Sequence, residues 1–171
     1  MAIRTAVVPV ADILDLRWQV LRPGLPRDAA VFPEDEQPGA FHIAAYDDAE
    51  PAPGAAGGVS GCGSFFPEAC PAVPGDGAYR IRGMASAPGQ RGRGFGAAVL
   101  DAGTREAAAR GARLMWCNGR TGARGFYERH GYTTVGDEFV IEGVGPHFVF
   151  ARPLDRHPEP CPPDRGIRGA P

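Results

Sequence analysis

The sequence predicts an α/β protein in which a central mixed β-sheet is flanked by helices. Short apolar strand patterns alternate with helix patterns along the chain, and the Ala-rich stretch at 96–110 is a strong helix former. No proline occurs from Gly89 to Gly145, so regular structure should be densest there. Alternating strands and helices favour a layered sheet with helices packed on its faces.

The N-terminal half carries one predicted helix among several strands. Ile13, Leu16 and Val20 recur near helical spacing and predict a helix at 11–21. Residues 22–40 are rich in proline and glycine and are expected to form an irregular loop. The other expected elements are strands at 3–8, 41–46, 57–66 and 79–86, a turn at 47–54 and a loop at 67–77.

The C-terminal half is predicted to be more regular. The helix at 96–110 ends at Gly111, a residue type favoured just past helix C-termini. After it we expect a strand at 113–117, a short helix at 123–130, and strands at 132–141 and 147–152 joined across 143–146. From Leu154 onward Pro, Arg and Gly dominate and little can be buried. The sequence thus predicts a single domain over 1–154 and a disordered tail over 155–171.

Length, charge and cysteine content exclude several classes of protein. The 171 residues correspond to one domain, and a formal net charge of −2 does not favour nucleic acid. No apolar run approaches the roughly 18 residues of a transmembrane helix, and the N-terminus lacks a signal-peptide core. The four cysteines form no C-x-x-C pair and have no histidine at zinc spacing. We therefore expect a cytoplasmic protein with free thiols, no metal site, and no nucleic acid or membrane partner.

The segment 86–96, Ser-Ala-Pro-Gly-Gln-Arg-Gly-Arg-Gly-Phe-Gly, carries the clearest chemistry. It joins a predicted strand to the start of the Ala-rich helix. Its glycines allow positive φ and close approach of the backbone to a ligand, and a helix N-terminus offers unpaired N–H groups. This combination predicts a phosphate or pyrophosphate site. The chain has no Lys, which excludes a Walker A loop, and G-x-G-x-G misses the dinucleotide spacing.

These residues resemble the signatures of the GCN5-related N-acetyltransferase (GNAT) superfamily. Arg91–Gly96 matches R/Q-x-x-G-x-G/A, and Met84–Pro88 resembles the end of the family's fourth strand. Asn118, followed by Ala123–Tyr132, resembles the second signature, which contains F-Y-E. The resemblance implies a GNAT-like fold whose central mixed sheet is splayed between strands 4 and 5. It is close over 79–153 and looser over 1–66.

The resemblance also implies an acyl-CoA donor, most often acetyl-CoA. The pyrophosphate would be held by the backbone of the glycine-rich turn, that is by Arg91, Gly92, Arg93, Gly94, Phe95 and Gly96. Pantetheine would lie in the V of the splayed sheet, beside Met84, Ala85, Ser86 and Asn118. Backbone amides near Ala85 and Ser86 would polarise the thioester carbonyl and stabilise its oxyanion.

The resemblance implies that Tyr127 is a general acid, because many family members use a tyrosine at this position to protonate the leaving thiolate. Alternatively, its ring only packs beneath the short helix. The general base is open, because the strand at 79–86 lacks the glutamate that many members place there. His147 is a candidate because histidine is the residue type that most often serves as a general base. The other candidates are Glu68, Glu138, Glu142 and a water chain, whereas His130 fits a helix C-terminus.

Arg80 and Arg82 lie on one face of their predicted strand, because side chains alternate along a strand. The pair could recognise a carboxylate on the acceptor, or it could form a solvated or ion-paired face. In the first case, the acceptor would be an amine with a carboxylate or a neutral body rather than a polycation.

The sequence as a whole therefore predicts an acyl-CoA-dependent N-acyltransferase. It would transfer acetyl from acetyl-CoA to a primary amine of a small molecule by direct attack. The alternatives are a non-catalytic CoA-binding or sensory module of the same fold, and a protein N-acetyltransferase. A homodimer is compatible with each of these three predictions. All 18 basic residues are Arg, a bias that suggests a GC-rich bacterial genome.

Overall fold

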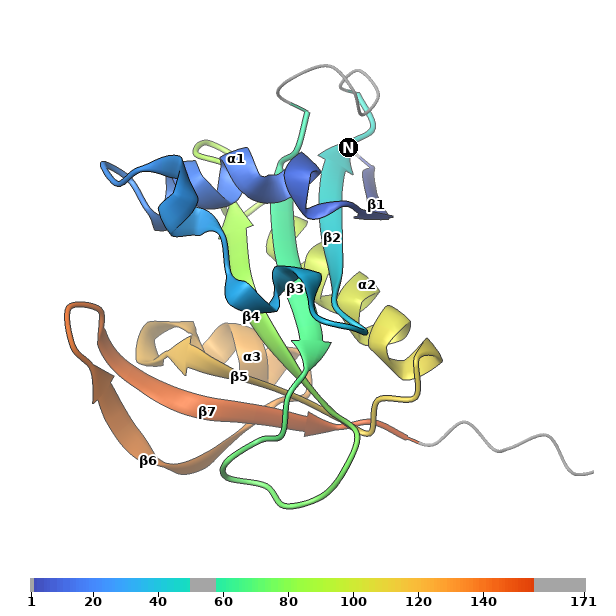
Figure 1. Cartoon of the computed structure of the whole chain (residues 1–171), viewed down its shortest axis with the longest axis vertical. Helices are drawn as coiled ribbons and strands as arrows, with labels where there is room; N and C mark the ends of the chain where they lie inside the picture. Colours follow the sequence, from blue (N-terminus) through green and yellow to red (C-terminus); the bar gives the residue numbers. More distant parts are fainter. Residues whose placement is uncertain (1, 50–57, 156–171) are drawn as a thin grey trace, which may run out of the picture.

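The computed structural model describes residues 2–49 and 58–155, which form a seven-stranded sheet with helices on both faces (Figure 1). The strands are β1 (Ile3–Val8), β2 (Phe41–Asp47), β3 (Gly61–Pro67), β4 (Ala78–Ser86), β5 (Leu114–Arg120), β6 (Thr133–Ile141) and β7 (Gly145–Pro153). The α-helices are α1 (Val10–Leu21), α2 (Phe95–Ala109) and α3 (Arg124–Arg129). The 3-10 helices are η1 (Arg27–Ala30), η2 (Pro33–Glu36) and η3 (Thr121–Ala123).

The sheet is splayed between β4 and β5. Its order is β1-β2-β3-β4-β5-β7-β6, and β4 pairs with β5 in parallel over only three positions, from Ala78–Leu114 to Arg80–Trp116. Beyond Arg80, β4 stays paired with β3 as far as Ser86, while β5 stays paired with β7 as far as Arg120. Each strand follows a different neighbour, so the sheet opens into a V. This confirms the predicted fold class and the predicted splay.

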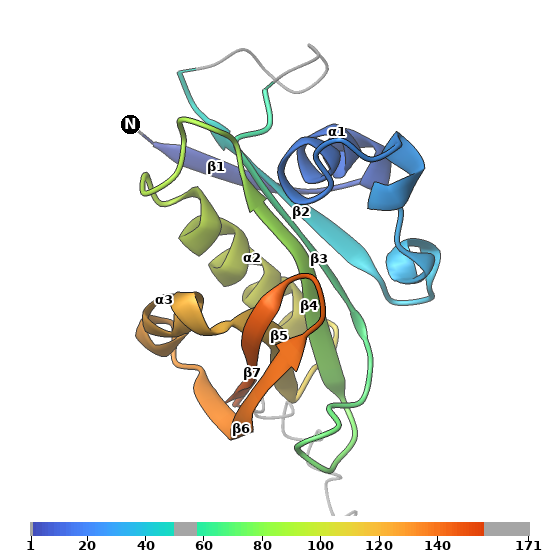
Figure 2. The ribbon, with the colours of Figure 1, turned by 90° about the vertical axis from the view of Figure 1, so that its left-hand side faces the viewer.

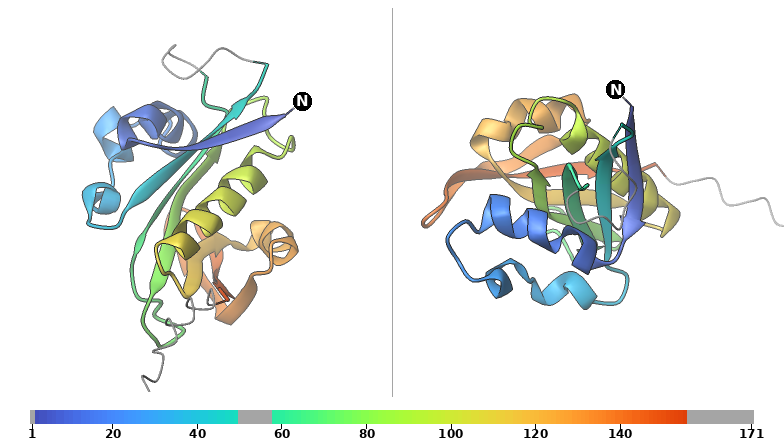
Figure 3. Two further views of the ribbon diagram at one scale, coloured as in Figure 1. Left: turned by 90° about the vertical axis from the view of Figure 1, so that its right-hand side faces the viewer. Right: turned by 90° about the horizontal axis from the view of Figure 1, so that it is seen from above.

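Helices α1 and α2 cover opposite faces of the sheet (Figures 2 and 3). Helix α2 packs against β1 to β4 and buries Val99, Leu100 and Ala107 in the main core. Gly103 sits where the Phe65 ring meets this helix, and a Cβ atom there would lie 2.0 Å from the ring. The glycine therefore allows α2 to lie directly on the sheet. Helix α3 lies on the same side of the sheet as α2 (Figure 3).

The segment 22–40 is more ordered than the sequence predicts. Instead of an irregular loop it contains η1 and η2, with Phe32 and Asp35 buried between them and the sheet. The proline-rich composition indicated a break in regular structure. It did not reveal that a distant arginine on α1 would anchor the segment.

That arginine is Arg17, whose side chain is fully buried. Its Nη1 donates to Asp35 Oδ2 at 2.8 Å and to the Ala30 carbonyl at 2.9 Å. Its Nη2 donates to Asp35 Oδ1 at 3.0 Å and to Ser64 Oγ on β3. The Arg17–Asp35 ion pair is bidentate, and bidentate arginine–carboxylate pairs are the strong form of such ion pairs. It ties η1, η2 and β3 to helix α1.

His42 completes this buried network. Its Nδ1 lies 2.7 Å from Ser64 Oγ, and its Nε2 lies 3.1 Å from the carbonyl oxygen of Asp35. A carbonyl only accepts, so Nε2 carries the hydrogen and Nδ1 accepts from the Ser64 hydroxyl. Burial lowers the pKa of His42, which agrees with a neutral ring in this chain of hydrogen bonds.

The remaining differences from the predicted elements are at their ends. Strand β5 runs on to Arg120, so Asn118 lies within it, where it pairs with Val149 of β7. Strand β7 begins at Gly145, two residues before the predicted start. Strand β3 begins at Gly61, whereas its predicted start at Gly57 lies outside the described residues. The predicted tail, apart from Asp155, also lies outside them.

Three cysteines, Cys62, Cys70 and Cys117, are buried free thiols. Within the two described ranges, no set of His, Cys, Asp or Glu side chains converges as metal ligands would. No helix in this part of the chain has both the length and the apolar character to cross a membrane.

Candidate active site

A cleft of about 790 Å³ opens where β4 and β5 diverge. Its lining includes nearly every residue that the sequence singled out for the cofactor and for catalysis. These are Met84, Ala85, Ser86, Arg91, Gly92, Gly94, Phe95, Gly96, Asn118, Tyr127 and His147. They come from β4, the turn before α2, β5, α3 and β7. These residues are spread over 64 positions of the chain, from 84 to 147, and the fold brings them together.

The glycine-rich turn forms one end of the cleft, at the N-terminus of α2. Gly92 and Gly94 have φ of 75° and 95°, a conformation that other residue types rarely adopt. Within the described residues, the N–H groups of residues 94–97 have no hydrogen-bond partner. Free N–H groups at the start of a fifteen-residue helix suit a bound anion.

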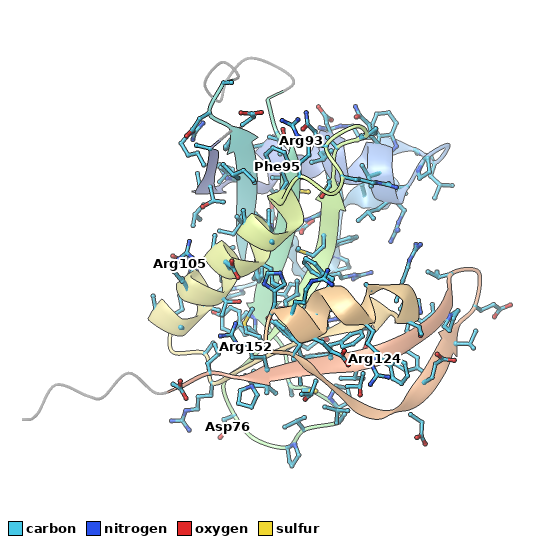
Figure 4. The ribbon with its side chains drawn as sticks, turned by 180° about the vertical axis from the view of Figure 1, so that it is seen from behind. Asp76, Arg93, Phe95, Arg105, Arg124 and Arg152 are labelled. Atoms are coloured by element: carbon cyan, nitrogen blue, oxygen red, sulfur yellow. The ribbon has the colours of Figure 1, made fainter. Side chains whose placement is uncertain are left out.

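The two arginines of the turn have different surroundings. Arg91 is exposed and lines the cleft. Arg93 does not line it: its guanidinium bonds Gln90 and lies 3.3 Å from an Asp47 carboxylate oxygen on β2. Its Cζ also lies 5.8 Å from the centre of the Phe95 ring (Figure 4). Arg91 is therefore the available cation, and the Arg93 side chain braces the turn against the sheet.

Strand β4 bulges in the middle of the V. Arg82 pairs with Ser64 and Ala85 with Cys62, so Gly83 and Met84 together face the single residue Gly63. Gly83 has a φ of 68°, and a Cβ atom there would lie 3.0 Å from the Phe32 ring. Because the bulged residue is left unpaired on the ladder, backbone groups of Gly83 and Met84 are available to a ligand in the V.

Tyr127 projects from α3 into the base of the cleft. Its ring stacks on Phe150 at 4.7 Å between centroids, and Gly119 on β5 makes this possible, since a Cβ there would lie 2.8 Å from Tyr127. Burial, and then the neighbouring Cys117 side chain, raises the pKa of Tyr127 well above its usual value. The phenol is protonated at neutral pH, as a tyrosine is at its usual pKa, and so carries a proton that it can donate.

His147 lines the cleft from β7 and is largely buried. Its Nδ1 lies 2.7 Å from the carbonyl oxygen of Gly145. A carbonyl only accepts, so in the neutral ring Nδ1 carries the hydrogen and Nε2 keeps a basic lone pair. The Phe139 ring, 6.0 Å away, lies roughly parallel to the imidazole and helps to fix its plane.

The other candidates for the general base lie elsewhere. Glu68 pairs with Arg80 at 2.9 Å, and Glu138 accepts a hydrogen bond from Thr121 at 2.9 Å. Neither these residues nor Glu142 line the cleft. His130 does, but its Nδ1 faces Asp101 at 3.4 Å. Unlike the three glutamates, His147 lines the cleft, and its hydrogen bond to the Gly145 carbonyl leaves the lone pair on Nε2.

Both arginines of β4 reach the cleft, and each has an acidic partner. Arg80 pairs with Glu68 and lies over the Trp116 ring, and Arg82 lies 3.3 Å from a Glu34 carboxylate oxygen. Two further lining residues, Arg22 and Phe32, come from α1 and the segment after it. Sequence reasoning missed both, because neither belongs to a motif and only the tertiary fold places them beside β4.

The comparisons with known proteins point to one family. The profile of the Acetyltransferase (GNAT) family matches residues 9–132. The uncharacterized N-acetyltransferase YitI of Bacillus subtilis (strain 168) is 30% identical over 147 residues, which span 86% of this chain and 93% of YitI. Escherichia coli ElaA superposes with a TM-score of 0.68 at 15% identity, over 88% of this chain and 99% of its own. A chain of the NatC complex, solved with Gag peptide and CoA, superposes with a TM-score of 0.67 at 14% identity, over 91% and 100% of the two chains.

A sheet splayed at a parallel pair, with a glycine-rich turn beside the opening, is the architecture that the resemblance to acyl-CoA-dependent acyltransferases predicts. The chain belongs to the acetyltransferase (GNAT) family. It is thus an N-acetyltransferase, as the sequence motifs predicted.

Proposed function

We propose that this enzyme transfers acetyl from acetyl-CoA to a primary amine of a small molecule by direct attack. The observation that carries the proposal is the single cleft lined by the turn at 91–96, the β4 bulge, Tyr127 and His147. One neighbour of the fold was solved with CoA, which fits the same donor here. The reduced, buried thiols fit a cytoplasmic enzyme.

The donor would bind across the opening of the sheet. The free N–H groups at 94–97 and the Arg91 guanidinium would hold the pyrophosphate. Pantetheine would run between β4 and β5, beside Asn118, and bring the thioester to the β4 bulge. Backbone N–H groups at the β4 bulge would then polarise its carbonyl and stabilise the oxyanion.

The proton transfers fall to two side chains. His147 Nε2 accepts a proton from the acceptor ammonium, directly or through one water, so that the amine lone pair can attack. The C–N bond forms and the C–S bond breaks. The Tyr127 hydroxyl protonates the departing thiolate, and the second amine proton leaves to solvent as the amide forms.

The Gly94→Glu variant tests where the donor binds. It places an anion at the helix N-terminus, and we expect acetyl-CoA affinity to fall more than about 100-fold, because like charges at an interface cost several kcal/mol. Calorimetry with acetyl-CoA measures this. Gly111→Glu is the matched control: Gly111 has a similar φ of 89°, lies at the other end of α2 and has open space around it. Equal affinity in the two folded variants would refute the placement.

The His147→Asn variant tests the base. Its side-chain amide can still donate to the Gly145 carbonyl, but it offers no basic nitrogen. We expect kcat to fall about 10²-fold at neutral pH with acetyl-CoA affinity unchanged. At higher pH the amine arrives deprotonated, so the deficit should shrink. A deficit of the same size at every pH would mean that His147 has no role in removing the proton.

Thiol release from acetyl-CoA with a panel of amines distinguishes this function from its alternatives. Turnover with small amines supports it. Binding of acetyl-CoA without turnover on any amine would indicate a CoA-binding module, and turnover confined to peptides would indicate a protein N-acetyltransferase.

A further inference from the structure

The lining of the cleft is rich in arginine. Six arginines line it, namely Arg22, Arg80, Arg82, Arg91, Arg120 and Arg129. No carboxylate is among the lining residues of the described chain. The pyrophosphate of the donor would account for Arg91 at the glycine-rich turn. It does not account for Arg22 and Arg82, which lie at the other end of the cleft, beside Phe32.

The arginines at that other end approach from the face of the sheet opposite α2. Arg22 caps the C-terminal end of α1, and Phe32 belongs to the segment that follows α1. Because α1 and α2 cover opposite faces, this part of the lining is separated by the sheet from the helix whose N-terminus would hold the pyrophosphate (Figures 2 and 3). It is therefore the part of the cleft left for the acceptor.

Three guanidinium groups surround the Phe32 ring. The Cζ atoms of Arg17 and Arg82 each lie 4.1 Å from its centroid, and that of Arg22 lies 6.0 Å away. Cations over aromatic faces are held in place by the ring quadrupole. The buried ion pair with Asp35 holds Phe32 in turn, because Asp35 Oδ2 also accepts the Phe32 backbone N–H at 2.9 Å. Phe32 is thus held through its backbone, and the guanidinium groups of Arg22 and Arg82 lie beside its ring on the lining of the cleft.

These cations differ in how far they are neutralised. Arg17 is matched by Asp35 and Arg82 by Glu34. Arg22 bonds only the carbonyl of Leu21, at 2.9 Å, and has no carboxylate partner in the described part of the chain. Burial lowers the pKa of Arg82, Glu34 raises it, and the neighbouring charges of Arg80, Arg22 and Arg17 lower it further. The acceptor end thus has an excess of positive charge.

Resting on the function proposed above, we propose that the acceptor is an amine that also carries a carboxylate, which Arg22 and Arg82 bind beside the Phe32 ring. Arginine suits this task because its planar fork can bind a carboxylate through two parallel hydrogen bonds. The same charges disfavour polycations such as polyamines. The pairing of Arg80 and Arg82 with acids thus refines the expectation from sequence, because of the three arginines Arg22, Arg80 and Arg82 it is Arg22 that has no carboxylate partner in the described chain.

The test compares acceptors that differ only in the carboxylate. Glycine, β-alanine, 4-aminobutyrate and 5-aminovalerate are assayed against their amides, with spermidine as a polycation, at fixed acetyl-CoA. We expect the best acid to exceed its amide in kcat/KM at least about tenfold, the scale of one hydrogen bond to a charged group. Arg22→Gln should reduce this ratio to about one by raising KM for the acid while kcat is kept, and Arg22→Lys should restore part of it.

Arg27→Gln is the matched control. Arg27 lies in the same segment, pairs with Asp15 at the surface and does not line the cleft, so this variant should keep the wild-type ratio. Amides or spermidine as the best wild-type acceptors, or an unchanged ratio in Arg22→Gln, would overturn the inference and leave the proposed function standing. Acetyl-CoA binding with no thiol release on any amine would instead overturn the proposed function, and this inference with it.

Discussion

Replacing Tyr127 by Phe is expected to lower kcat by about 10²–10⁴-fold, the usual contribution of a positioned general acid. The hydroxyl acts on charge that develops on sulfur only as the C–S bond breaks, so acetyl-CoA affinity should hardly change. The ring should stay in place, because its stacking on Phe150 does not involve the hydroxyl. Steady-state kinetics together with calorimetric acetyl-CoA binding measures both parts of this result.

Tyr132→Phe is the matched control for this variant. Tyr132 belongs to the same aromatic cluster, with its ring 5.7 Å from that of Tyr127, but it does not line the cleft. It should keep wild-type turnover. Wild-type turnover in Tyr127→Phe as well would mean that Tyr127 serves only in packing and that solvent protonates the thiolate.

Replacing Asp35 by Ala is expected to destabilise the protein by about 3–5 kcal/mol, the usual cost of leaving a buried charge without its partner. Arg17 is fully buried, and both of its terminal nitrogens donate to this carboxylate. Its Nε already has no partner in the described part of the chain. Urea denaturation of the wild type and the variant measures the loss of free energy of unfolding.

The Asp15–Arg27 pair supplies the comparison for this prediction. Its two side chains meet at 2.7 Å but are 68% and 48% exposed. Asp15→Ala should therefore cost less than about 1 kcal/mol, since solvent screens a surface ion pair. Equal losses in the two variants would contradict the importance of burial at Arg17. We also expect surviving Asp35→Ala protein to have a weakened acceptor site, because Asp35 holds the Phe32 backbone.

The donor half of the cleft could be predicted from sequence because its determinants are local. The glycines of the turn, the start of α2 and the end of β4 are contiguous in the chain, so their geometry follows from short-range rules. Tyr127 could be placed because it stands at a fixed position within a motif on a single short helix. The resemblance to the acetyltransferase family then supplied the chemistry that this geometry serves.

The same reasoning assigned Arg93 to the cofactor, and the structure places its side chain beside Asp47 rather than on the lining of the cleft. Its carboxylate partner, Asp47, lies 46 residues earlier in the chain. Local sequence cannot show such a partner. Strand pairing likewise brings His147 on β7 to the lining of the cleft, whereas the three glutamates proposed from sequence lie outside it.

What the sequence by itself determined is the class of the protein, the order of its elements and the glycine-rich turn before α2, all of which depend on neighbouring residues. Only the tertiary structure decided the proposed acceptor end, where Arg22 and Phe32 from the first third of the chain line one cleft with Arg82 on β4 and His147 on β7. The Arg17–Asp35 pair that organises this end spans 18 residues of proline-rich chain. Propensity and periodicity describe backbone preferences over a few residues, whereas burial of a charge with its partner is settled only when distant segments pack together.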